Sequence, residues 1–345
     1  MYITMEFRKA IKTSRFMDPM QGFQEIRRSS QVRYDPLTGH TTRILDFPVK
    51  QMEKADLEGL VSRSKQEFCP FCPDIIHQVT PEFSPDLLKK KRYARGEALC
   101  VPNVFPCDEN AAVTVMSRQH YLPLDRFTTR IIQDAIICCI DYLGDVFERQ
   151  PDVVYQSINW NYMPLAGGSI IHPHLQITAS STPTNYYTDA LFHLENYYAD
   201  HSSDFWLDLI AEEKKQGQRF IVSSDTMSWV VAFAPMGVFD IIGIMPSVSS
   251  PRDMQDTCMD DLTEGIMNIL GFIDSLNMYS LNMSIFFLLD NGIFTPHLRI
   301  CPRVSIPPLD TSQINYMGML HNENVTIMSP EDVCSAIKKE WKGNR

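Results

Sequence analysis

The chain has 345 residues, of which 44% are hydrophobic and 21% charged, the composition of a folded globular protein. Its length is enough for two to three domains or for one fused pair of domains. The formal net charge of −11 leaves no basic excess to neutralise phosphates, which argues against a nucleic-acid partner. No apolar run approaches the length of a membrane span, and residues 1–12 lack the apolar core of a signal peptide, so we expect a cytoplasmic protein with no membrane partner.

The first half of the chain contains several segments with clear patterns. They are a hairpin at 31–45, a cysteine knuckle at 68–72, an extended run at 111–116, an amphipathic helix at 126–149, and strands at 153–159 and 172–180. The hairpin is predicted because Asp35-Pro36 and Gly39 supply turn residues between two extended runs.

The second half repeats this order. Strands are predicted at 219–223, 229–234, 241–245 and 284–289, a helix at 260–276, and a further strand from 296 whose Pro-His-Leu-Arg-Ile echoes Pro-His-Leu-Gln-Ile at 173–177. We interpret this as an internal duplication with its junction in a helical segment at 185–217, giving halves 1–184 and 185–345. Strands linked by short turns favour an antiparallel α+β fold over a parallel doubly wound sheet.

Two histidines and a glutamine alternate at 172–176. In a strand, His172, His174 and Gln176 would share one face, with apolar side chains on the other. Gly168 and Ser169, just before them, let a ligand approach the backbone and offer N–H groups to a phosphate.

This pattern points to phosphorus chemistry at His174. An imidazole nitrogen can attack phosphorus and carry it as a phosphoramidate, provided that the other ring nitrogen is held by a backbone carbonyl. Gln176 cannot titrate and can only hydrogen-bond to phosphoryl oxygens, which favours transfer to another phosphate over attack by water.

The pair Cys69-x-x-Cys72 has the spacing of a metal knuckle. Zinc needs two further ligands, for which His77, His120 and His172 are the candidates. Unliganded thiols or a redox pair are the alternative interpretations.

The chain resembles the galactose-1-phosphate uridylyltransferase family of the histidine-triad superfamily. The resemblance rests on six short matches in a shared order: Asp35-Pro36-Leu37-Thr38-Gly39, Cys69-Pro70-Phe71-Cys72, Asn103-Val104-Phe105-Pro106, Asn161, Ser169 with His172-Pro173-His174-Leu175-Gln176, and Trp229-Val230-Val231-Ala232-Phe233-Ala234-Pro235. It covers residues 31–345. Leu175, in place of the usual glycine, departs from the family pattern.

The resemblance implies two fused histidine-triad-like halves that form an antiparallel half-barrel sheet flanked by helices. It implies His174 as the nucleophile beside Gln176, and a homodimer in which each site borrows residues from its partner. The implied ligands of a structural zinc are Cys69, Cys72, His120 and His172. The implied nucleotide- and phosphate-binding residues are Asn103, Phe105, Asn161, Gly168, Ser169 and Gln176.

Three polar residues near the end of the chain are candidates for binding an anionic acceptor: His297, Arg299 and Arg303. Arg299 stands where the resemblance would give a second histidine after His297. Its alternative role is to pair with a carboxylate.

The leading hypothesis is a nucleotidyltransferase of carbohydrate metabolism. It would move a nucleoside monophosphate between phosphate esters of the sugar 1-phosphate type through a nucleotidyl-histidine, taking it from a nucleotide sugar or related nucleotide. The alternatives are a phosphorylase or hydrolase of a nucleotide sugar or dinucleoside polyphosphate, and a zinc-stabilised nucleotide-binding protein that has lost catalysis.

Overall fold

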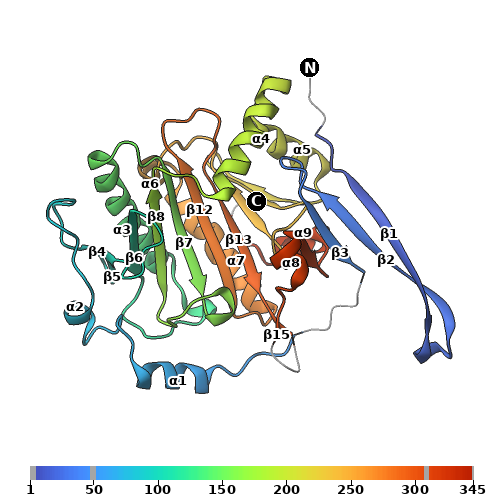
Figure 1. Cartoon of the computed structure of the whole chain (residues 1–345), viewed down its shortest axis with the longest axis horizontal. Helices are drawn as coiled ribbons and strands as arrows, with labels where there is room; N and C mark the ends of the chain where they lie inside the picture. Colours follow the sequence, from blue (N-terminus) through green and yellow to red (C-terminus); the bar gives the residue numbers. More distant parts are fainter. Residues whose placement is uncertain (1–4, 47–51, 307–310, 344–345) are drawn as a thin grey trace.

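A ten-stranded antiparallel sheet forms the centre of the protein (Figure 1). The computed structural model describes residues 5–46, 52–306 and 311–343. Across the sheet the order is β4-β5-β6-β8-β7-β12-β13-β11-β10-β9. The strands are β4 (Tyr93–Arg95), β5 (Ala98–Pro102), β6 (Asn110–Val115), β7 (Tyr155–Tyr162), β8 (His174–Ser180), β9 (Phe220–Ser223), β10 (Ser228–Val231), β11 (Ile241–Ile244), β12 (Ser280–Leu288) and β13 (His297–Arg303).

The strand order is symmetric about the junction of β7 and β12. β8 lies beside β7 as β13 lies beside β12, and β6, β5 and β4 follow outward as β11, β10 and β9 do. A long helix joins β6 to β7 in the first half and β11 to β12 in the second. This arrangement agrees with the predicted duplication, whereas the boundary at 184/185 stays a prediction.

Helices α3 (Thr129–Arg149), α6 (Pro251–Thr257) and α7 (Met259–Ser275) cover one face of the sheet. In α3, apolar residues at helical spacing face the strands, and the Thr128 hydroxyl caps the first turn by accepting from the Ile131 N–H. The largest apolar cluster lies here and includes Leu175 and Ile177 of β8 together with Leu298 and Ile300 of β13. Burial of these side chains fixes which face of β8 and β13 points away from the helices.

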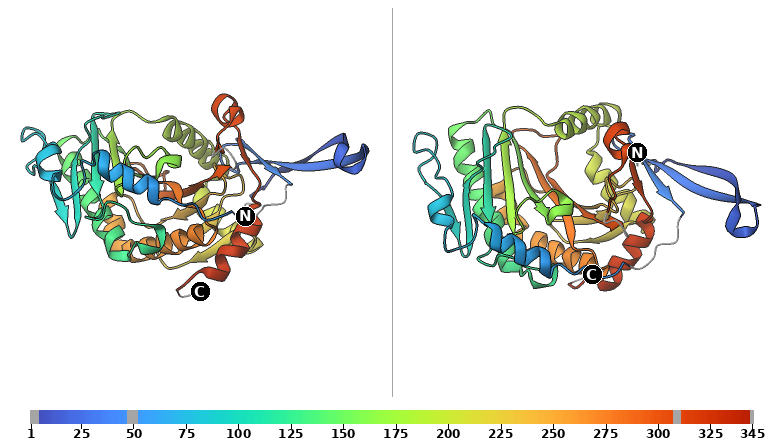
Figure 2. Two further views of the ribbon diagram at one scale, coloured as in Figure 1. Left: turned by 90° about the horizontal axis from the view of Figure 1, so that it is seen from below. Right: turned by 60° about the horizontal axis from the view of Figure 1, so that its bottom comes forward.

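On the opposite face, helices cover only the second half, whereas in the first half the knuckle loop packs over β5 and β6. Helices α4 (Asn185–His201) and α5 (Phe205–Gln216) pack there against β10, β11 and the end of β12 (Figure 2). In the first half the same face carries half-buried polar residues, among them Asn159, Asn161 and Gln176. The sequence predicted this helical junction and the polar face, but not that the helices shield one half alone.

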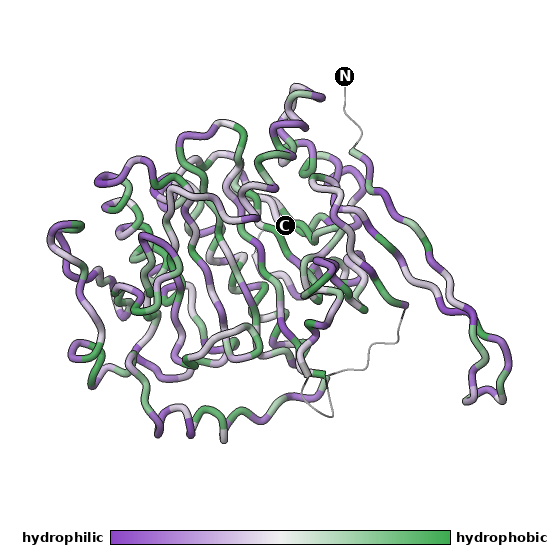
Figure 3. Tube along the Cα trace, viewed as in Figure 1, coloured by the Kyte–Doolittle hydropathy of each residue, from purple (hydrophilic) through white to green (hydrophobic). Residues whose placement is uncertain are grey.

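A second sheet pairs β1 (Lys9–Asp18), β2 (Gln24–Tyr34), β3 (Thr41–Leu45) and β16 (Asn324–Thr326). β1 and β2 extend from the body as a long arm, with hydrophilic and hydrophobic residues along it (Figure 3). At the tip Met20 is 90% exposed. The predicted hairpin at 31–45 is confirmed, since β2 pairs with β3 across the Asp35–His40 turn.

Shorter elements complete the chain. They are the helices α1 (Glu58–Glu67), α2 (Ile76–Val79), α8 (Tyr316–His321) and α9 (Pro330–Glu340), the 3-10 turns η1 (Pro19–Gln21), η2 (Leu124–Arg126) and η3 (Pro164–Ala166), and a small pair of strands, β14 (Ser305–Ile306) with β15 (Thr311–Ser312). Among the described helices, none is both long and apolar enough to cross a membrane.

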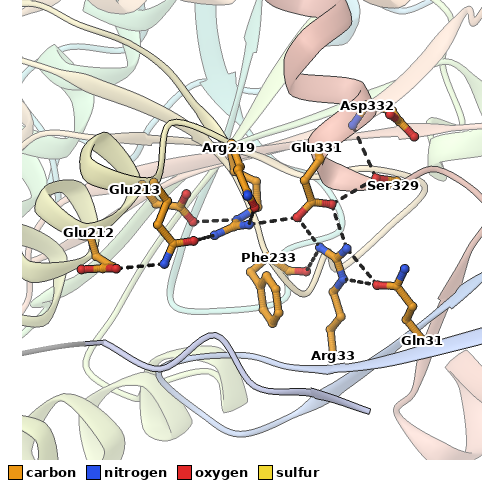
Figure 4. Close-up of polar contacts among 11 residues, drawn as sticks. Gln31, Arg33, Glu212, Glu213, Arg219, Phe233, Ser329, Glu331 and Asp332 are labelled. Carbon is orange, nitrogen blue, oxygen red and sulfur yellow. Dashed lines mark hydrogen bonds and ion pairs between the residues drawn. The ribbon is translucent and has the colours of Figure 1, made fainter. Parts of the chain in front are cut away.

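A partly buried ionic network fastens α9 to the rest (Figure 4). Glu331 at the start of α9 accepts from Arg33 of β2 through both carboxylate oxygens, at 2.9 and 2.8 Å. It also accepts from Arg219, 2.9 Å away, and Arg219 in turn bonds Glu213 of α5 at 2.9 Å. Both arginines are about 2% exposed and Glu331 is 29% exposed, so a partly buried network joins the small sheet, α5 and α9.

Candidate functional site

A tight turn leads from β7 into β8. It runs through η3 to Gly167, whose φ of 85° suits glycine. Gly168 lies so close to the end of β7 that a Cβ there would come within 2.8 Å of the Asn161 carbonyl oxygen. Ser169 is exposed, and the turn therefore brings backbone and a hydroxyl next to the polar face of β7 and β8.

His174, the first residue of β8, is held by the backbone. Its Nδ1–H donates to the His172 carbonyl at 2.7 Å, which fixes the tautomer and leaves Nε2 with a lone pair. Among the described residues, Nε2 has no hydrogen-bond partner. It is not one of the fully buried polar atoms that lack a partner, so it is not sealed off from solvent. The ring is 5% exposed and lies against Phe71, with ring centroids 5.2 Å apart. Burial lowers the pKa of His174, which keeps the ring neutral.

A chain of three amides orders Gln176. The Asn282 side-chain NH₂ donates to the Ala166 carbonyl at 2.9 Å, so its orientation is fixed by a backbone acceptor. The same NH₂ donates to Asn161 Oδ1 at 2.8 Å, and Asn161 Nδ2 donates to Gln176 Oε1 at 3.3 Å. Gln176 Nε2 is therefore left to donate to a ligand beside His174.

Sequence reasoning missed Asn282. It stands on β12 in the second half and reaches Asn161 because β12 pairs with β7, with the two asparagines opposite each other in the register. The available signal in the sequence was the alternation of polar and apolar residues along this strand, which puts Asn282 on the same face as the polar side chains two positions away. The site in the first half is thus completed across the junction of the two halves.

Four side chains gather where the knuckle loop meets the approach to β8. The ligand atoms of Cys69, Cys72, His120 and His172 lie within 4.8 Å of one another. His172 Nδ1 is 3.6 Å from Cys69 Sγ, and His120 Nδ1 is 3.4 Å from Cys72 Sγ. His77, the remaining candidate, lies outside this group and contacts Arg92.

The residues around the cluster fit a bound metal ion. His172 Nε2 is 2.7 Å from the Ser117 carbonyl, and His120 Nε2 is 2.9 Å from Ser64 Oγ. Each imidazole can therefore give its outer N–H to an oxygen and turn Nδ1 inward as a ligand. Without a cation, burial raises the pKa of the Cys69 thiol to about 11, and a metal ion would reverse this by binding the thiolate.

Two of the predicted nucleotide-binding residues lie at the end of β8 opposite to His174. Asn103 and Phe105 belong to the loop between β5 and β6, beside the far end of β8, because Asn110 pairs with Ala179. Five residues of strand, about 16 Å, separate that end from His174. Phe105 is 87% exposed, so its ring is free to meet a ligand.

The three candidate acceptor residues make different contacts. Arg303 donates to the Leu165 carbonyl at 3.2 Å and so lies beside the turn that precedes β8. Arg299 pairs with the buried Asp240, at 3.1 Å from Nε, the alternative role that its sequence allowed. His297 is fully buried, and its Nε2 lies 2.6 Å from the Tyr186 hydroxyl.

Comparison with known proteins supports the fold. No protein-family model matches the chain. An uncharacterised protein of Archaeoglobus fulgidus is 30% identical over 338 residues, 98% of this chain and 99% of that protein.

Several solved structures share the architecture. A GalT-like protein of Arabidopsis thaliana matches with a TM-score of 0.68 at 18% identity, covering 89% of this chain and 98% of its own. An ADP-glucose phosphorylase of Arabidopsis thaliana with bound ADP-glucose gives 0.66 at 17% identity, with coverage of 89% and 98%. A uridylyltransferase gives 0.64 at 18% identity, with coverage of 90% and 98%. The chain belongs to the same family as the Archaeoglobus fulgidus protein, and its fold is that of the GalT-like protein and the uridylyltransferase.

Proposed function

We propose that the protein is a nucleotidyltransferase that carries a nucleoside monophosphate on His174. The observation that carries the proposal is the state of this ring, since Nδ1–H is bound to a backbone carbonyl and Nε2 is left with a lone pair. A nitrogen prepared in this way is a nucleophile that needs no separate base.

The reaction would proceed by two displacements. Nε2 attacks the α-phosphorus of a nucleoside diphosphate derivative, the N–P bond forms, and the bond to the leaving phosphate ester breaks. An oxygen of a second phosphate ester then attacks the same phosphorus, and the N–P bond breaks. The phosphate ester leaves in the first step as a stable anion, and in the second step His174, with its proton still on Nδ1, leaves as a neutral imidazole, so neither departure requires a proton from another group of the protein.

The residues beside His174 suit this path. The free Nε2 of Gln176 can donate a hydrogen bond to a phosphoryl oxygen. The amide does not titrate, so it cannot act as an acid or base that helps water to attack. Gly168 and Ser169 would hold phosphate oxygens at the turn, and Arg303 beside that turn would attract an anionic acceptor. Asn161 would contact the nucleotide near His174, with Asn103 and Phe105 meeting its far end.

We infer that Cys69, Cys72, His120 and His172 hold zinc. Two thiolates and two imidazoles are a tetrahedral zinc set, and four protein ligands leave no open position for catalysis. Bound zinc would fasten the knuckle loop to the residues that position His174. We expect about one zinc per chain by elemental analysis and loss of zinc with a lower melting temperature in Cys72→Ser, whereas the exposed Cys107→Ser should retain the metal.

Covalent labelling tests the nucleotidyltransferase directly. The full chain is incubated with UDP-glucose, ADP-glucose or diadenosine tetraphosphate, quenched, and analysed by intact mass and peptide mapping. We expect an adduct of one nucleoside monophosphate on His174, absent in His174→Ala and retained in His193→Ala. Failure of all three donors to label a zinc-loaded protein would refute the proposal.

A phosphorylase is the second candidate, because one fold neighbour is an ADP-glucose phosphorylase. Both activities share the His174 adduct and differ in the acceptor. Discharge of the isolated adduct by orthophosphate, with glucose 1-phosphate inactive, would identify a phosphorylase. The homodimer implied by the resemblance remains part of the proposal, and light scattering of the full chain tests it.

A further inference from the structure

The outer part of the arm, residues 11–29, has no hydrophobic core of its own. Here β2 has β1 on one side and no strand on the other, because β3 pairs with β2 only from Ser30 onward. All side chains of Ile11–Met17 are exposed, and in β2 the stretch before Ser30 is exposed except for the half-buried Ile26. A pair of strands without further packing is marginally stable in water, so we expect the arm to be stabilised by a surface outside its own chain.

The arm exposes apolar side chains on both faces and at its tip. Ile11 and Met17 point to one face of the ribbon and Phe16 points to the other, because alternate residues of a strand face opposite sides. At the tip Met20 and Phe23 are 90% and 65% exposed. Large apolar side chains gathered on one extension of a protein are typical of a contact surface.

The arm is basic, whereas the rest of the chain is acidic. Residues 11–29 contain four basic and two acidic side chains, a net charge of +2, so the other residues carry −13 within the formal total of −11. Arg15 and Arg27 lie directly opposite each other in the register of β1 and β2, and therefore on the same face. Like charges in such a pair repel, so a partner that brings carboxylates to these guanidinium groups stabilises the ribbon.

The charge of the body decides which class of partner fits the arm. A nucleic acid or an anionic membrane would be attracted by the arm but repelled by a body that carries −13. A second copy of this chain offers the carboxylates that the arm attracts, and its own arm can make the same contact in return. Charge complementarity therefore favours a second copy.

Helix α4 presents a surface that matches the arm. Phe192, Glu195 and Tyr198 are spaced three residues apart, so they are neighbours along one side of the helix, and the exposed Asp200 follows them. Both aromatic side chains are more than half exposed. Within the described parts of the chain, neither Glu195 nor Asp200 forms an ion pair. Helix α8 also exposes apolar side chains, but it carries no carboxylate.

The dimensions of the two elements agree as well. From Ile11 to Asp18 strand β1 spans about 25 Å, and the 17 residues of α4 also span about 25 Å. Figures 1 and 2 show α4 on the outside of the body and the arm extending away from the body. Each surface is therefore open to a second chain.

We propose that the arm docks along the outer side of α4 in a second copy of this chain, with its basic side chains against Glu195 and Asp200 and its apolar ones against Phe192 and Tyr198. The arm of the second copy docks on the first in the same way, which gives a twofold dimer with two equivalent contacts. This contact rests on the homodimer of the proposed function and gives it a surface, but it does not depend on the chemistry at His174.

Charge reversal on each side tests the contact. Arg15→Glu/Arg27→Glu reverses the charge of the arm. Glu195→Arg/Asp200→Arg reverses the charge of the α4 surface. All four side chains are exposed, so we expect both variants to fold, which thermal melting checks.

Sedimentation equilibrium of the full chains measures the dimer. The matched control is Arg63→Glu/Lys89→Glu, which reverses two exposed basic residues of the body. We expect the wild type and the control to form dimers of equal affinity, and each reversed variant to dimerise at least about tenfold more weakly. An equimolar mixture of the two reversed variants should restore the dimer, because the acidic arm then meets the basic helix while the other arm and helix keep their native charges.

The outcomes separate this contact from the rest of the proposed function. A monomeric wild type, a dimer unaffected by both reversals, or a mixture that fails to associate would overturn the proposal. Binding of poly(U) RNA or of phosphatidylserine vesicles by a monomeric wild type, abolished by reversal of the arm, would also overturn it by assigning the arm to another class of partner. A dimer that persists in both reversed variants would leave the homodimer standing without this contact, and covalent labelling of His174 in the wild type is scored independently.

Discussion

The ionic network around Glu331 should be a major contributor to stability. Glu331→Gln removes the charge that faces two buried arginines, Arg33 and Arg219, while keeping the shape of the side chain. Burial disfavours the charged carboxylate, but hydrogen bonds and charge from the arginines outweigh this and lower its pKa from 4.5 to about 2. One pKa unit corresponds to about 1.4 kcal/mol, so the network favours ionised Glu331 by about 3 kcal/mol. Breaking a buried ion pair by removing one partner costs about 3–5 kcal/mol, which is consistent.

Urea unfolding followed by fluorescence at pH 7 measures this loss. We expect Glu331→Gln to lower the free energy of unfolding by about 3 kcal/mol, and Asp332→Asn, an exposed change in the same first turn of α9, by less than about 1 kcal/mol. Because the folded-state pKa is depressed, the contribution is present above about pH 4.5 and is lost as the pH falls toward 2. The difference in the free energy of unfolding between wild type and Glu331→Gln should therefore narrow as the pH falls from about 4.5 toward 2. A gap at pH 7 no larger than that of Asp332→Asn would refute the reasoning.

Three further predictions, the first with a matched control, test packing and the site. Gly265→Ala would place a Cβ in steric conflict with the Trp229 ring and should lower the free energy of unfolding by about 1–3 kcal/mol. Gly271→Ala in the same helix meets open space and should raise it by about 0.5 kcal/mol, both measured by urea titration. Asn282→Asp cannot donate to its two acceptors and should slow covalent labelling about tenfold in rapid-quench assays, with an unchanged rate counting against the amide chain. Gln176→His introduces a group that can protonate a leaving group and assist water, so the isolated adduct should hydrolyse at least tenfold faster; an equally stable adduct would contradict the role assigned to the amide.

Local patterns in the sequence were enough to predict the main elements. The helices at 126–149 and 260–276 became α3 and α7, and the strands at 172–180 and from 296 became β8 and β13, each within a few residues. These segments are long or strictly periodic, and the periodicity reports which face is buried. The matching order of elements in the two halves predicted an internal duplication, and the symmetric order of the strands agrees with it.

What the sequence did not predict depends on contacts between distant residues. β1 and the first part of β2 are exposed on both sides and show no clear alternation, so the sequence predicted no strand there. Asn282 acts through a register that only the pairing of β12 with β7 creates. Arg33, Arg219 and Glu331 are charged residues that would ordinarily be placed at the surface, and only the fold shows that they neutralise one another in the interior.

The two halves show how one strand motif can serve two roles. His174 and His297 begin equivalent strands, and each bonds through Nδ1 to the carbonyl two residues before it, at 2.7 and 2.8 Å. The backbone therefore prepares both rings in the same way. In the second half, however, Tyr186 occupies Nε2 and α5 places Trp206 on the ring, so that nitrogen cannot reach a phosphorus atom. Reactivity at this position is thus decided by what covers the strand.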